Sequence, residues 1–161
     1  MFAIEINLIL TNLFRHCSSY PPIRFLGVYS RDQIPSESYV NTLTPCSYVA
    51  NIDPSNMPGS HWVAFYHPAP NYVYFFDSFG SAPSLFDFKF PGKYHGTHNH
   101  YLIQSLNSQA CGQYCIYFLY LCATHQDVNH LLHRFSLLPS QQADALITQA
   151  ILKIKRLFHI K

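Results

Sequence analysis

Charged residues are scarce in this chain. Only 11% of its 161 residues are Asp, Glu, Lys or Arg, against roughly 25% in an average soluble domain. Together with 48% hydrophobic residues, this composition excludes a disordered chain, an acidic solvating tail and a highly charged coiled coil. The formal net charge is only +2, so bulk charge does not indicate a nucleic-acid or membrane-surface binder.

Long hydrophobic runs and export signals are also lacking. The longest apolar run, Cys115–Ala123, is far short of the ~20 residues that a membrane-spanning helix needs. The amino terminus has no basic start and carries Glu5 and Asn7 inside its apolar stretch, which makes a poor signal peptide. The five cysteines show no small-domain disulfide spacing. We therefore expect an intracellular protein with mostly reduced thiols and no membrane partner.

Aromatic residues, in contrast, are abundant. Thirteen Phe and 12 Tyr favour a core that contains a β-sheet, and the length fits a single domain over residues 1–161. Strands are predicted over 24–29, 46–52, 61–66 and 72–77, where β-branched and aromatic residues gather. The segment 30–45 is predicted to be a polar connection, and 84–100 to be irregular.

Three helices are predicted from apolar periodicity. They cover residues 4–16, the almost wholly apolar stretch 111–124, and a stripe that begins after Pro139, with Ser140 as its cap. The order of elements predicts an α+β fold rather than a doubly wound sheet. We expect a small mixed or antiparallel sheet packed against a central buried helix, with further helices at both ends.

The strands 61–66 and 72–77 are joined by HPAPN and predict a β-hairpin. If Tyr66 opposes Tyr72, then His61 faces Asp77 on one side of the sheet, with Cβ atoms roughly 4.5–5.5 Å apart. A carboxylate at that distance accepts the imidazole N–H, holds its tautomer and stabilises the imidazolium. A slip of one residue would place the two side chains on opposite faces.

Cys111 follows a short polar run and begins the apolar helix. The unpaired N–H groups and the dipole at a helix start lower a thiol pKa and favour the thiolate. Gly112 permits a close approach of other backbone, and amides at this turn can bind a developing oxyanion. A nearby imidazole promotes the thiolate and later protonates a leaving amine. These residues predict a nucleophile, a base and an orienting acid.

The segments GSHWVAFYH, YFFDSFG and IQSLNSQACGQYC together resemble the adenovirus protease (adenain) family of adeno-like viruses and large DNA transposons. This family shares a clan with the SUMO-deconjugating proteases, and an early FLGVYS extends the resemblance over most of the chain. It implies a papain-related cysteine protease fold with His61 as general base, Asp77 as its acidic partner and Cys111 as nucleophile. It also implies that Gln104, seven residues before the cysteine, is the oxyanion donor, a role that suits a neutral amide. Gln109 is the rival for that role.

The resemblance also implies partners. The substrates would be viral or transposon-encoded precursor proteins, cut at small-residue, glycine-containing sites during maturation in the virion and host nucleus. It implies an activating viral peptide and stimulation by DNA, although the chemistry itself requires no cofactor. The stretch between Asp77 and Gln104 has no cysteine, so the family's activating disulfide should be absent or different. The resemblance implies that Trp62 flanks the substrate cleft, and the alternative is that Trp62 is only a core residue. We expect the protein to be a monomer.

Other interpretations stay open at this stage. One is a deconjugase for a Gly-Gly-ended ubiquitin-like modifier, and another is an inactive module that keeps the fold. The basic segment KIKRLFHIK at 153–161 is a solvated helix face more readily than a phosphate-binding patch.

Two clusters resemble metal sites only superficially. One is the H-x-x-H-x-H pattern of His95, His98 and His100, and the other is Cys111 with Cys115. Neither has further ligands beside it, so no metal is expected.

Overall fold

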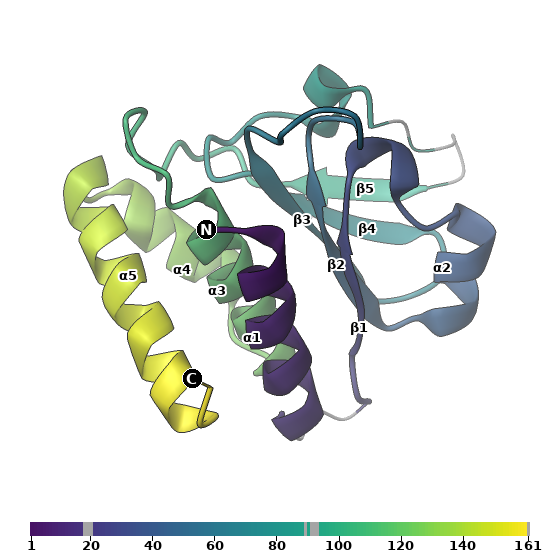
Figure 1. Ribbon diagram of the computed structural model, residues 1–161, viewed down its shortest axis with the longest axis horizontal. Coiled ribbons are helices and arrows are strands. Elements are labelled where there is room, and N and C mark those ends of the chain that lie inside the picture. Colours follow the sequence, from purple (N-terminus) through teal and green to yellow (C-terminus); the bar gives the residue numbers. More distant parts are fainter. Residues whose placement is uncertain (18–20, 89, 91–93, 161) are drawn as a thin grey trace.

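A computed structural model describes residues 1–17, 21–88, 90 and 94–160, and over these residues the chain forms a mixed five-stranded sheet with helices on both faces (Figure 1). The predicted α+β class is confirmed. In chain order the elements are α1 (Ala3–His16), β1 (Arg24–Tyr29), η1 (Arg31–Gln33), α2 (Glu37–Leu43), β2 (Cys46–Asn51), β3 (Trp62–His67), β4 (Tyr72–Phe76), η2 (Pro83–Phe86), β5 (His95–His98), α3 (Cys111–Ala123), α4 (Val128–Ser136) and α5 (Ser140–Leu157).

The strands lie side by side in the order β1-β2-β3-β4-β5. The two outer pairs are parallel, and the two inner pairs are antiparallel. On one face α1 packs against β1 and α3 against β3, with α5 outside α3 (Figure 1). On the other face α2 and the segment around Phe88 cover a second apolar cluster. Because both faces are covered, the central strands are continuous hydrophobic runs rather than alternating ones.

The helix α3 is the centre of the larger apolar cluster. Ten of its 13 residues are buried, including Tyr114, Phe118 and Leu119. Burial on all sides explains why its sequence shows almost no polar face. Within the described ranges, no helix combines the length and apolar character that crossing a bilayer requires.

Several elements differ from the sequence-based expectations. The connection 30–45 contains η1 and α2, and the segment predicted to be irregular contains η2 and β5. The helix α4 was not predicted, although Asp127 caps it by accepting a hydrogen bond from the His130 amide at 3.0 Å. Ser140 is the first residue of α5 and makes no side-chain cap, since Pro139 occupies the cap position. The elements η1, α2, η2 and β5 are too short to show a periodic pattern. The helix α4 did carry a signal that was missed, because its apolar residues Val128, Leu131, Leu132 and Phe135 have helical spacing.

The predicted hairpin register was wrong by two residues. Tyr66 pairs with Tyr74, not with Tyr72. The turn is held from outside the hairpin, because Asn41 of α2 exchanges hydrogen bonds with Asn71, which adopts a left-handed conformation at φ 61°. A shift of two residues leaves every side chain on its predicted face, whereas a shift of one would not.

Candidate active site

His61 and Asp77 meet at one end of the sheet. His61 directly precedes β3 and Asp77 directly follows β4, and these strands are antiparallel neighbours. The observed register, continued past the strand ends, sets Phe79 opposite His61, so Asp77 is a diagonal rather than a direct neighbour. The His61 Nε2 atom nevertheless lies 2.6 Å from Asp77 Oδ1. The predicted pairing of these two side chains is present, although the predicted register is not.

Asp77 is fully buried and held on all sides. Besides the imidazole, its carboxylate accepts the backbone amides of Phe79 at 3.2 Å and Ser81 at 3.0 Å. Burial raises the pKa of Asp77, but the bonds to His61 and the two amides outweigh it and leave this pKa below its ordinary value. The carboxylate is therefore ionised at neutral pH and accepts the Nε2 proton, so Nδ1 is the ring nitrogen left for another partner.

That partner is Cys111. The residue begins α3, as predicted, and its thiol lies close enough to the His61 side chain for each group to shift the pKa of the other. Burial raises the pKa of Cys111, but the interaction with His61 and the backbone amides of Trp62 and Gly112 outweigh it and hold this pKa below its ordinary value. Burial by contrast lowers the pKa of His61, but the hydrogen bond to Asp77 and the nearby Cys111 sulfur reverse this and raise it to about 9. Both shifts favour a thiolate beside an imidazolium.

Aromatic rings shield this pair from water. The Phe79 ring stacks on the His61 ring with centroids 4.9 Å apart, and the Phe86 ring lies at 6.2 Å. His61 is only 7% exposed. A low local dielectric strengthens the hydrogen bond between His61 and Asp77.

Gln104 is buried at 1% exposure and held at both ends of its amide. Ser78 Oγ donates to Gln104 Oε1 at 2.6 Å, and Gln104 Nε2 donates to the Ser108 carbonyl at 2.9 Å. These two bonds fix which way the amide faces and leave Nε2 with a second N–H. Gln109, the rival candidate, is exposed.

A cleft of about 900 Å³ brings the candidate residues together. His61, Trp62, Gln104 and Cys111 all line it, and so does the exposed Gln109. Its remaining lining comes from the start of α1, the last residue of β2 and the loops around these residues: Met1, Phe2, Ala3, Ile4, Ser30, Asn51, Asp53, Pro54, Met57, Pro58, Gly59, Ser60, Phe79, Leu106 and Ser108.

Trp62 and Gly112 tie the start of α1 to the cleft. Trp62 is half-buried, and its indole Nε1 donates to the Met1 carbonyl at 3.2 Å. A Cβ atom on Gly112 would lie 2.9 Å from Ile6 Cδ1. Gly112 therefore permits a close approach, as predicted, but of side chains from α1 rather than of backbone.

Three supporting side chains were missed by the sequence-based reasoning. Asn99, 3% exposed, accepts the Asp77 amide at 3.0 Å and donates to the Asp77 carbonyl at 2.6 Å. Asp144 of α5 accepts the Tyr114 hydroxyl at 2.9 Å and the Ser105 amide at 3.3 Å, which anchors the segment next to Gln104. The third is Ser78. Of these three, only Ser78 could have been found from the sequence, because it directly follows the candidate acid Asp77.

The side chains of His95, His98 and His100 do not line this cleft. His95 and His98 belong to β5, and the His98 and His100 rings lie 4.2 Å apart. Among the described residues, no group of three or more His, Cys, Asp or Glu side chains is arranged to hold a metal ion.

Comparisons with known proteins add no family to this description. A scan against models of protein families found no match, and a search of the curated proteins found none.

Proposed function

We propose that this chain is a cysteine endopeptidase of the adenain-like type. The observation that carries the proposal is the buried hydrogen bond between His61 and Asp77, with the Cys111 thiol beside His61 and the Gln104 amide in the same cleft. Nucleophile, base, orienting acid and oxyanion donor are the parts that thiol-dependent acyl transfer needs. The four residues come from separate parts of the fold, so their convergence is not a by-product of one element.

The reaction follows from the positions of the groups. The Cys111 thiolate attacks the scissile carbonyl carbon, and the carbonyl electrons move onto oxygen. The second N–H of Gln104 Nε2 and a backbone amide of Cys111 or Gly112 stabilise that oxyanion, since the first turn of α3 leaves its N–H groups without helical partners. The C–N bond then breaks, and the His61 imidazolium gives its Nδ1 proton to the departing amine.

Hydrolysis of the resulting thioester reverses these roles. His61 takes a proton from water, the hydroxide adds to the thioester carbon, and the C–S bond breaks to restore the Cys111 thiolate. Asp77 stays ionised throughout and stabilises the imidazolium each time it forms.

By resemblance, the substrates are viral or transposon-encoded precursor proteins with glycine-containing sites, and the reaction takes place inside the cell or the virion, where thiols are reduced. An activating peptide and DNA belong to the same proposal. The basic segment at the end of α5 gives DNA modest support. Lys155 in it already pairs with Glu5 at 3.3 Å, and Lys161 lies outside the described residues.

The test is a cleavage profile on a library of glycine-containing peptides, with and without DNA and a candidate viral peptide. We expect cleavage by the wild-type protein, none by Cys111→Ala, and full activity from Cys17→Ala, since Cys17 follows α1 and does not line the cleft. Uncut peptides under all conditions would contradict the endopeptidase. Release of a Gly-Gly-ended modifier instead would assign a deconjugase, and a Cys111→Ala protein with every measurable function intact would assign an inactive module.

A further inference from the structure

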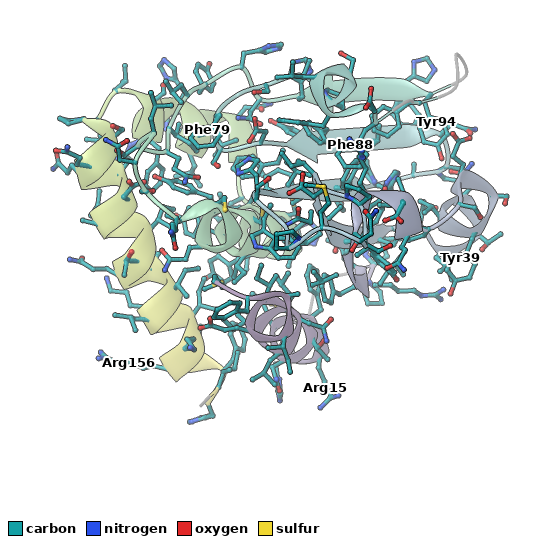
Figure 2. All side chains as sticks on the ribbon, turned by 45° about the horizontal axis from the view of Figure 1, so that its top comes forward. Arg15, Tyr39, Phe79, Phe88, Tyr94 and Arg156 are labelled. Carbon is teal, nitrogen blue, oxygen red and sulfur yellow. The ribbon has the colours of Figure 1, made fainter. Side chains whose placement is uncertain are left out.

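A second cavity lies on the opposite side of the sheet from α3. It has a volume of about 510 Å³, within the range of small-molecule sites. It shares no lining residue with the cleft around Cys111. In Figure 2, Tyr94 of its lining lies toward α2, as does Tyr39, whereas Phe79, which covers His61, lies toward the other side. We name it the His67 pocket; its lining is Ile34, Pro35, Ser36, Glu37, Ser38, Val40, Tyr48, His67, Phe90 and Tyr94.

His67 carries an unused hydrogen-bond acceptor at this pocket. The side chain ends β3 and is 2% exposed, and its Nδ1 lies 3.0 Å from the Tyr72 carbonyl. A carbonyl only accepts, so Nδ1 holds the proton and the neutral ring presents Nε2 as a bare lone pair. Nε2 is buried and has no hydrogen-bond partner. Burial lowers the pKa of His67 to about 4, against the opposing effect of the Tyr72 carbonyl, so Nε2 remains an acceptor at neutral pH.

Aromatic rings surround this acceptor. The Tyr48 ring stacks on the His67 ring at 5.7 Å, and the Tyr94 ring meets it edge-on at 6.3 Å. Phe90 stacks on Tyr94 at 6.0 Å. Ring faces and edges of this kind favour another ring, which gains offset-stacked or edge-to-face contacts. Among the described lining residues, Glu37 carries a negative charge, which disfavours an anion.

We propose that the His67 pocket binds a neutral aromatic ring that carries one hydrogen-bond donor, a phenol or an indole, with the donor bound to His67 Nε2. The ring replaces water between the aromatic walls, and its O–H or N–H satisfies an acceptor that costs free energy while it is buried and unpaired. The same chemistry reaches the pocket either as a free small molecule or as a Tyr or Trp side chain of another polypeptide. This site does not depend on the proposed peptidase activity.

The test uses nitrogen NMR of the labelled full chain, which reads the His67 ring directly. The probes are p-cresol and indole, each with a matched ring that lacks the donor, 4-methylanisole and benzofuran. We expect the donor rings to shift the Nε2 resonance and to bind about 3- to 10-fold more tightly than their partners, as one neutral hydrogen bond implies. In His67→Phe, which keeps a ring but loses the acceptor, this preference should vanish, whereas Ser38→Ala at the same pocket should keep it.

Further ligands show whether the bound ring belongs to a polypeptide or to a free small molecule, and which results overturn the proposal. N-acetyl-tyrosinamide or N-acetyl-tryptophanamide binding at least as tightly as the free rings would identify a polypeptide side chain, and weaker binding would identify a free molecule. The proposal is overturned if no ring shifts Nε2, if the donor-free rings bind equally well, or if n-butylammonium binds more tightly than p-cresol. Whether any ring shifts the Nε2 resonance is measured on the wild-type protein alone, so this result does not depend on the folding of His67→Phe.

Discussion

Ser78 offers a sharp test of how the candidate oxyanion site is organised. Its hydroxyl is fully buried and donates to Gln104 Oε1 at 2.6 Å, while Gln104 Nε2 donates to the Ser108 carbonyl at 2.9 Å. Ser78→Ala removes the first bond and leaves the second. A flipped amide would set its oxygen against the Ser108 carbonyl, so the correct orientation is weakened in this variant but not lost.

The expected magnitude follows from that partial loss. Removal of a whole oxyanion donor costs about 10²–10³ in kcat, which sets the expectation for Gln104→Ala. The single neutral hydrogen bond of Ser78 contributes roughly 1–1.4 kcal/mol, so we expect Ser78→Ala to lower kcat about 5- to 10-fold.

Two assays separate this effect from damage to the nucleophile. Peptide turnover requires oxyanion stabilisation, whereas alkylation of Cys111 by iodoacetamide forms no oxyanion. We expect Ser78→Ala and Gln104→Ala to lose turnover and to keep the wild-type alkylation rate. Ser136→Ala, which removes an equivalent hydroxyl bonded to the His133 carbonyl on α4, should change neither rate.

Two results would refute this reasoning. If alkylation of Ser78→Ala fell as much as turnover, Ser78 would act through Asp77 and His61 instead. If Gln104→Ala kept full turnover while Cys111→Ala had none, the amide of Gln104 would not be an oxyanion donor, and the peptidase proposal itself would stand.

Four further predictions concern reactivity and stability. The Cys111 alkylation rate should rise with pH at a midpoint below the pKa of an ordinary thiol, and His61→Ala should move that midpoint upward, because the imidazolium that stabilises the thiolate is gone. Turnover should fall above about pH 9, where His61 loses the proton that the leaving amine requires; unchanged turnover at pH 10 would exclude His61 as the acid. Asn99→Ala should lower the free energy of unfolding by about 1–3 kcal/mol in urea titrations, since it leaves the buried Asp77 amide unpaired; a loss below about 0.5 kcal/mol would contradict this. Phe65→Ala should cost about 3–5 kcal/mol in the same titration, because the fully buried ring packs on Tyr48 at 4.6 Å.

The elements that could be predicted from the sequence are those with a strong local pattern. The apolar run of α3 and the aromatic strands β3 and β4 were found within one or two residues, because burial of a whole segment leaves a continuous signal in a short window. The position of Cys111 at the start of α3 followed from the same signal, since the polar run ends where the helix begins.

The elements that could not be predicted are held by distant partners. Val40 is the buried residue of α2, and this short helix is tied to the β3–β4 turn through Asn41 and Asn71. The strand β5 is rich in histidine and has little strand propensity, but it pairs in parallel with β4 about 20 residues earlier. Such contacts leave no periodicity for a local pattern to reveal.

The candidate site divides in the same way. The residue types that could act as nucleophile, base and acid were identifiable in the sequence, because reactive groups at a helix start or a strand end are local features. Gln104 was expected only from the family resemblance. The hairpin register, the approach of the Cys111 thiol to His61, and the supports from Ser78, Asn99 and Asp144 were decided only by the tertiary structure. A hydrogen bond 2.6 Å long depends on the packing of several elements at once, and no single stretch of sequence contains that information.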